Sequence, residues 1–562
     1  MSKDTLLGFG GAVYINNEGE VRDNIFTNNV LTGTFAGYGG ALSIKSGTVI
    51  NCNFTNNKVN ATVESNGGGL WIRSGTVRYC KFNNNYASKL GGALWTEDHS
   101  TISDCDFNNN KASDSGGAIL YRYGGEVENC NFTNNSATDS GAIEMRTGNV
   151  INSNFNNNSA SSVGGAISFA SNGNVYKCNF TDNSASLGGG AIYFNNSGKI
   201  SECDFISNKL NNNETSQGGA VFFKNNGEMT ICNFINNTVN GSSDSEGSAV
   251  WIKSGNVTNC NFTGNSASEN GGGIYLYENY DMKNCNFNNN SAGKNGGAVF
   301  LYNNGNMTYC NLSNNYASLS GGAVWGYRYP TVSYCNLSNN EAKGKDGYGG
   351  AISISSGAIT NCNFANNTAT AGGGAVWMDS GVIEACDFTS NQATATKSLG
   401  GAIDINSGTV SNCNFTENFA AFIGGAVNFN NEDNLTNCNV INNTAYNIGG
   451  GVRFNCTANV SNSNFTGNIA WTNGGGLWAE SANVENSNFT LNRAINGSAI
   501  YFSAPSGSKT IKDSTFLANK ADSKKVAISN DESIVRLSLI GGNNYINAIY
   551  STGEVDFENV IY

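Results

Sequence analysis

A nine-residue phrase, "NCNFTNNSA" at residues 129–137, returns along the chain in close copies about every twenty-five residues. Two anchors align twenty copies: Gly-Gly-Ala followed by an aliphatic residue, and Phe-x-x-Asn. The Asn of the second anchor is present in every copy, and only Leu312, Leu337 and Val440 replace its Phe. A fixed period of this length indicates a solenoid, in which each coil buries its apolar face against its neighbours.

Within each copy the residues alternate as in a strand. In Leu94-Trp95-Thr96 and its equivalents the first and third residues are mostly apolar, while the middle one varies freely. Cys-Asn-Phe repeats this alternation, with Cys and Phe predicted inward. Gly-Gly suits a corner with positive φ. The constant Asn suits a left-handed turn or a stack of hydrogen-bonded side chains along the axis. A Leu-x-x-Leu-x-Leu pattern is missing, which disfavours a leucine-rich horseshoe.

The spacing locates the free edge of each coil. From the constant Asn to the Ala position of the next Gly-Gly-Ala is usually 7 or 8 residues. Insertions lengthen this distance to 11 or 12 after six of these asparagines: Asn29, Asn57, Asn208, Asn237, Asn340 and Asn391. We therefore expect an all-β parallel β-helix of about 20 coils, roughly 25 residues per coil, with loops at one corner. The repeat domain is predicted at residues 1–519, and degenerate C-terminal coils with a cap at residues 520–562.

The anchors resemble known repeats. Gly-Gly-Ala-Ile and Phe-x-x-Asn are similar to the repeats of the chlamydial polymorphic outer-membrane proteins, and the Asn-rich "NCNFTNNSA" style resembles the adhesin-like surface proteins of methanogenic archaea. The resemblance implies a right-handed parallel β-helix on the cell surface and a role in adhesion. No signal peptide, anchor or autotransporter barrel is visible. We therefore expect a monomeric fragment of a larger, extracellular surface protein.

Charge and composition exclude several functions. The formal net charge of −12 disfavours nucleic acid as a partner. No run of eighteen apolar residues occurs, so we expect no membrane insertion within this chain. Fifteen of the sixteen cysteines occupy one column and lack close pairs, which predicts buried structural thiols rather than disulfides or a metal site. We expect neither a metal nor another cofactor.

Aromatic residues gather in the predicted outward slots. Two residues after the Ala, five successive copies carry aromatic side chains, and two residues further on three copies carry Tyr. An exposed row of this kind is typical of an interaction site, although cross-strand stacking explains it as well. The predicted ligand-binding residues are Phe222, Trp251, Tyr275, Tyr277, Phe300, Tyr302, Trp325 and Tyr327.

Three functions remain open at this point. An adhesin-like rod would bind a glycan or a protein on another cell surface through the aromatic face, and a spacer would bind nothing. A polysaccharide lyase or hydrolase would need clustered carboxylates, for which the sequence offers only Glu97, Arg122, Glu144 and Arg146. A solvated salt-bridge patch explains the Glu144/Arg146 group better, so we predict no catalytic residues and prefer the adhesin.

Overall fold

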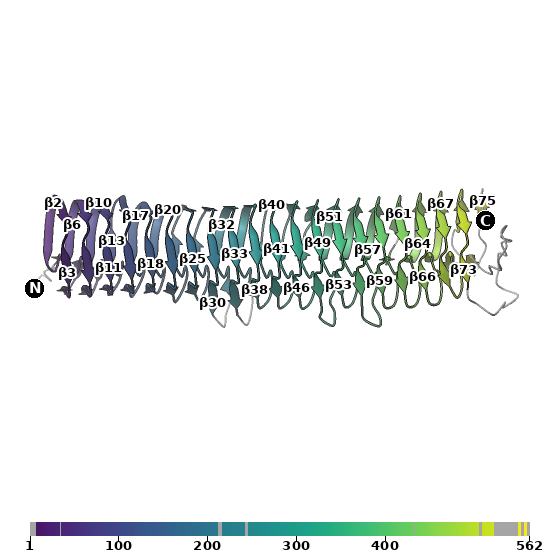
Figure 1. Ribbon diagram of the computed structural model, residues 1–562, viewed down its shortest axis with the longest axis horizontal. Helices are drawn as coiled ribbons and strands as arrows, with labels where there is room; N and C mark the ends of the chain where they lie inside the picture. Colours follow the sequence, from purple (N-terminus) through teal and green to yellow (C-terminus); the bar gives the residue numbers. More distant parts are fainter. Residues whose placement is uncertain are drawn as a thin grey trace, which may run out of the picture. The chain divides into compact units, whose positions relative to one another are not determined.

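The computed structural model describes residues 7–33, 35–211, 216–241, 245–431, 433–504, 509–521, 549–551 and 556–558. The chain divides into two compact units, Met1–Tyr280 and Asp281–Tyr562. Each unit is a stack of β-coils, coloured purple to teal in the first and teal to yellow in the second (Figure 1). The described residues contain strands and turns but no helix, and the strands pair in parallel. The prediction of an all-β parallel solenoid of about 20 coils is confirmed.

Each coil contributes to three strand columns, as one coil of the first unit shows. Its strands are β13 (Leu94–Thr96), β14 (Ser100–Ser103), β15 (Asp106–Asn108) and β16 (Lys111–Ala112). In the next coil β13 and β14 both pair with β17 (Ile119–Glu128), β15 pairs with β18 (Asn131–Thr133), and β16 pairs with β19 (Ser136–Ala137). The register places like anchors directly above one another, as in the pair Phe107↔Phe132.

The core of each coil follows from this register. The Phe107 and Phe132 rings are fully buried and stack with centroids 4.8 Å apart and planes 4° apart. Burial of each ring contributes roughly 1.5–3 kcal/mol, which a single thin coil could not obtain. In the second unit Leu312 and Leu337 occupy the same inward column and are buried equally well.

The constant Asn forms a buried ladder inside each unit. Asn135 donates from Nδ2 to the Phe107 carbonyl at 3.0 Å and to Asn158 Oδ1 at 3.0 Å, and its Oδ1 accepts from the Asn110 backbone N–H at 2.9 Å. The expected stack is therefore present. The constant Asn itself was expected to take the left-handed turn conformation, and this was wrong by one residue. The residue before it, Asn134, has φ 57° and is exposed.

The two glycines of the corner have different roles. Gly116 has φ 65°, which confirms the expected positive φ. For Gly117 the constraint is space, because a Cβ there would lie 2.0 Å from the carbonyl oxygen of Gly141 in the next coil. Serine replaces the first glycine at Ser140, which has φ 58°, and the second glycine at Ser248 and Ser498, so glycine is strongly preferred at both positions but not obligatory.

The cysteines form the predicted buried column. All sixteen are free thiols; fifteen are buried, and Cys456, outside the column, is half-buried. Successive thiols contact the backbone of the neighbouring coil, as where the Cys52 N–H points at Cys80 Sγ at 3.4 Å. Burial raises the pKa of the Cys105 thiol well above its ordinary value.

The insertions lie at one corner, as expected, and in the first unit they build extra strands. After Asn29 and Asn57 the chain forms β5 (Ala36–Tyr38) and β9 (Glu64–Asn66), which pair with β1 (Leu7–Phe9) in a separate three-stranded sheet. After Asn208 and Asn237 it forms β31 (Ser216–Gln217) and β35 (Ser245–Glu246), which pair with each other. Each extra sheet places side chains beside the outward slot of the main column.

The C-terminal region continues the stack in degenerate form. The strands β74 (Ile549–Ser551) and β75 (Asp556–Glu558) pair in parallel with β70 (Ile500–Phe502) and β71 (Thr510–Lys512). Residues 522–548 of the predicted C-terminal region lie outside the described residues, and the C-terminal cap stays a prediction.

Candidate functional site

The predicted aromatic residues of the first unit lie in one column but are not exposed. Phe222 stacks on Trp251 at 4.7 Å between ring centroids, and Trp251 stacks on Tyr275 at 6.2 Å. All three side chains are buried, and Tyr277 is half-buried against Trp251. The premise of an open aromatic patch is wrong here, because the segment before Gly-Gly passes over the outward slot. A Cβ on Gly188, for example, would lie 3.7 Å from the Phe222 ring.

The predicted residues of the second unit show the same pattern with more exposure. Phe300 is buried and stacks on the half-buried Trp325 at 4.4 Å. Tyr302 is half-buried, and Tyr327 is 41% exposed and lies 5.6 Å from the Tyr302 ring. Stacking along the column is therefore observed in both units, and ligand binding by these eight residues stays a prediction.

A groove in the first unit is the better candidate site. It has a volume of about 520 Å³, within the range of small-molecule sites, and it lies between the small sheet β1–β5–β9 and the main column. Its apolar lining consists of Leu7, Phe9, Tyr38, Val63, Trp71, Leu90, Trp95 and Leu120. Its polar lining consists of Lys45, Glu64, Asn66, Arg73, Lys89, Glu97, Asp114 and Arg122.

The aromatic side chains enclose the groove from two sides. Trp71 in β10 (Leu70–Arg78) and Trp95 in β13 are register partners, and their rings stack at 6.2 Å and 13°. Tyr38 from β5 meets both at 51–59°, and Phe9 from β1 stacks on Tyr38 at 5.2 Å. Trp71 and Trp95 occupy the outward slot of the repeat but were not among the eight predicted residues, and Tyr38 and Phe9 were missed as well. The insertion after Asn29 was the only signal for Tyr38, and Phe9 comes from the beginning of the chain, ahead of the first Gly-Gly-Ala.

Three buried polar atoms in the lining have no hydrogen-bond partner. They are the Nε1 atoms of Trp71 and Trp95, whose side chains are 5% exposed, and Oδ1 of Asn66, which is 4% exposed. An orphaned buried polar group costs about 1–3 kcal/mol. The equivalent Trp251 avoids this cost, because its Nε1 donates to Glu246 Oε2 at 3.1 Å. At the groove, the extra strands supply no such acceptor.

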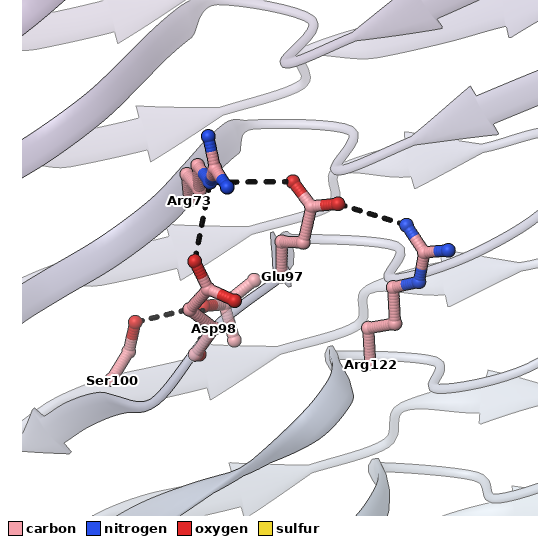
Figure 2. Close-up of polar contacts among 6 residues, drawn as sticks. Arg73, Glu97, Asp98, Ser100 and Arg122 are labelled. Atoms are coloured by element: carbon pink, nitrogen blue, oxygen red, sulfur yellow. Dashed lines mark hydrogen bonds and ion pairs between the residues drawn. The ribbon is translucent and has the colours of Figure 1, made fainter.

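Charged side chains form a paired network at the groove (Figure 2). Arg122 Nη1 lies 2.8 Å from Glu97 Oε1, and Arg73 Nε lies 3.8 Å from Glu97 Oε2 and 3.2 Å from Asp98 Oδ2. Both arginine side chains are more than half exposed, so these pairs add little to stability. Glu64 accepts a hydrogen bond from the Tyr38 hydroxyl, and that bond together with burial raises the pKa of Tyr38.

The residues considered for catalysis are only partly brought together. Glu97 and Arg122 form an ion pair at the groove. Glu144 is the register partner of Leu120 in the next coil. Burial, with Asp139 and Asp114 nearby, raises the pKa of Glu144 to about 7. Arg146 is exposed, and no ion pair to Glu144 is found. The salt-bridge patch expected at Glu144 and Arg146 is therefore not formed, and the ion pair lies instead between Glu97 and Arg122.

The described ranges lack the side-chain clusters of a metal site and the long apolar helices of a membrane span. Within them, no group of three or more His, Cys, Asp or Glu side chains is placed to hold a metal ion. The described ranges also contain no helix with the length and apolar character needed to cross a membrane.

Comparison with known proteins supports the repeat and the fold. The profile of the right handed beta helix region matches residues 248–407, and that of the Chlamydia polymorphic membrane protein repeat matches residues 79–97, 104–121 and 177–195. No curated protein and no solved structure matches the chain. The first two polymorphic-repeat matches include Trp95, Glu97 and Leu120 of the groove. The chain is thus a right-handed β-helical protein with polymorphic membrane protein-like repeats, features that suggest an adhesin-type surface protein.

Proposed function

We propose that this chain is the attachment region of an adhesin-like extracellular protein, and that it binds glycan on another cell or partner surface through its aromatic groove. The observation that carries the proposal is the aromatic groove with three orphaned polar atoms, built by strands that the repeat alone does not require. Repeats of the polymorphic membrane protein type support display at a surface. The likeness to archaeal adhesin-like proteins stays a prediction.

The groove favours binding over a spacer role for a physical reason. A surface that serves only as a spacer gains nothing from leaving the Trp71 and Trp95 N–H groups unsatisfied, since an acceptor such as Glu246 at Trp251 removes the cost. Binding sites, in contrast, commonly keep donors and acceptors unpaired until the ligand arrives.

The enzyme alternative has one specific observation behind it. A carboxyl whose pKa lies near 7 can act as a general acid, and Glu144 has this property close to the groove. An activity assay must therefore accompany every binding assay. Glu144→Gln separates the two functions, because it abolishes acid catalysis and leaves the aromatic lining intact.

The test measures retention of the purified chain on immobilised polysaccharides and cell-wall preparations, together with newly formed sugar ends. We expect retention without release, and at least a tenfold loss of retention in Trp71→Ala/Trp95→Ala. Trp377→Ala, a half-buried outward Trp of the second unit, is the matched control. Trp251→Ala and Trp325→Ala test the two predicted aromatic columns.

Three results would contradict the proposal. Release of sugar ends that Glu144→Gln abolishes would establish an enzyme. Retention that depends on Trp251 or Trp325 and survives loss of the groove tryptophans would move the site to the predicted columns. Absence of retention on every surface would leave a spacer.

A further inference from the structure

The groove also identifies the class of sugar. Its orphaned atoms are two N–H donors, from Trp71 and Trp95, and one carbonyl acceptor, from Asn66. A carboxylate or sulfate can accept from the donors but cannot donate to Asn66 Oδ1. A sugar hydroxyl does both, because it carries one donor and two acceptor sites. A ligand rich in hydroxyl groups therefore satisfies all three atoms, and because acidic sugars carry hydroxyl groups as well, the charges of the groove must separate neutral from acidic sugars.

The charges of the groove point away from an acidic sugar. Four cationic side chains line the groove: Lys45, Arg73, Lys89 and Arg122. Three carboxylates also line it: Glu64, Glu97 and Asp114. Asp98 is not part of the lining but pairs with Arg73, and with it the four positive charges are matched by four negative ones. An anionic polymer would gain no net attraction from a neutral groove in a chain of net charge −12.

The rings supply the remaining contacts. The half-buried rings of Phe9 and Tyr38, with centroids 5.2 Å apart, keep part of their apolar faces accessible beside the buried rings of Trp71 and Trp95. The C–H face of an uncharged pyranose can pack on such faces, and its hydroxyl edge can reach polar groups at the rim. Paired arginine and carboxylate side chains such as Arg122 and Glu97 offer both donors and acceptors there.

We infer that the groove binds a neutral, hydroxyl-rich sugar segment and discriminates against uronic-acid or sulfated sugars. This inference rests on the proposed function and names its ligand class. The two Nε1 atoms expose almost no surface in the ligand-free groove. A bound hydroxyl therefore reaches them only after a lining side chain rotates, which makes their signals specific reporters of binding.

The experiment uses the full chain labelled with 5-fluorotryptophan, which gives one ¹⁹F NMR signal for each of seven Trp residues. Cellotetraose and mannotetraose are the neutral probes, and tetragalacturonate is the acidic one. Trp71→Phe and Trp95→Phe assign the two groove signals and remove the N–H donor, replacing the indole with a smaller aromatic ring. We expect a neutral probe to shift both signals, with little response to tetragalacturonate.

The donor variants supply the second readout. Trp95→Phe should weaken binding of the neutral probe about tenfold, the effect of losing one well-placed hydrogen bond. Trp251→Phe is the matched control, because that indole N–H is already bonded to Glu246 and its loss should leave affinity unchanged.

The outcomes separate this inference from the proposed function. Tetragalacturonate binding at the groove as tightly as a neutral probe would overturn the inference and leave attachment standing. Retention on cell surfaces by a protein ligand, with no response to any sugar, would overturn it as well. Failure to bind any surface or probe would overturn both, whereas shifts confined to Trp71 and Trp95 with neutral sugars would support both.

Discussion

The Asn ladder gives a sharp stability prediction, in which Asn135→Ala is compared with Asn134→Ala. Asn135 Oδ1 is the acceptor for the Asn110 backbone N–H at 2.9 Å and for Asn110 Nδ2 at 3.0 Å. Its own Nδ2 donates to Phe107 and Asn158. Alanine leaves two buried donors of Asn110 without an acceptor and deletes two further bonds. At about 1–3 kcal/mol per orphaned donor, the two donors alone account for a loss of about 2–6 kcal/mol.

The neighbouring substitution is the control because it changes the same residue type on the exposed side of the turn. Asn134→Ala forces Ala into φ 57° and removes one exposed bond from Asn157 Nδ2, so we expect a loss of about 1–2 kcal/mol. The two variants thus make the same substitution at adjacent positions, and the two sites differ in burial and hydrogen bonding.

Hydrogen exchange read by mass spectrometry is the suitable assay, because stacked coils can open locally without unfolding the whole unit. In Asn135→Ala, amides of the coils around residues 105–160 should lose protection by about 10²–10⁴-fold, since each 1.4 kcal/mol corresponds to a factor of ten. Asn134→Ala should lose about tenfold. If both variants exchange alike, the ladder does not stabilise the stack in the way argued.

Three further predictions concern stability and reactivity. Burial raises the pKa of Asp404 from 3.8 to about 6, so the free energy of unfolding of the second unit should fall by up to about 3 kcal/mol as pH rises from 4 to 6. Urea titrations at each pH measure this dependence, and Asp404→Asn should flatten it. A variant whose unfolding free energy depends on pH as steeply as that of the native chain would contradict the prediction. Native protein should react with a thiol reagent at Cys456 only, and the other fifteen thiols should react after unfolding; rapid labelling of more than one would refute their burial. Phe132→Leu should cost under about 1.5 kcal/mol, because Leu312 and Leu337 already occupy this column, whereas Phe132→Ala should cost about 3–5 kcal/mol; equal denaturation midpoints would refute the packing argument.

The sequence predicts the columns of this fold well, because period and alternation define them directly. The alternation at Leu94-Trp95-Thr96 and the Phe-x-x-Asn spacing place inward residues correctly in both units. Two adjacent asparagines, Asn134 and Asn135, look equivalent in sequence, and only the backbone shows which one turns and which one stacks.

The site was less accessible to sequence reasoning, for a geometric reason. Alternation separates inward from outward but does not show that the segment before Gly-Gly covers the outward slot, as it does at Phe222 and Trp251. The groove depends on three strands, β1, β5 and β9, that come from the beginning of the chain and from two insertions. The length of an insertion shows in the sequence that an extra strand can form there. It does not show which side chains that strand places beside Trp71 and Trp95.

The parallel pairing of successive coils has a mechanical consequence within each unit. The hydrogen bonds between coils point along the stacking direction, so tension applied in that direction loads one coil interface at a time. Each coil that detaches releases about 25 residues, which extend to roughly 80–90 Å where the folded coil occupied one strand spacing of about 4.8 Å. A stack of this kind should yield under load in a series of small, similar steps, lengthening and dissipating work while the remaining coils stay folded.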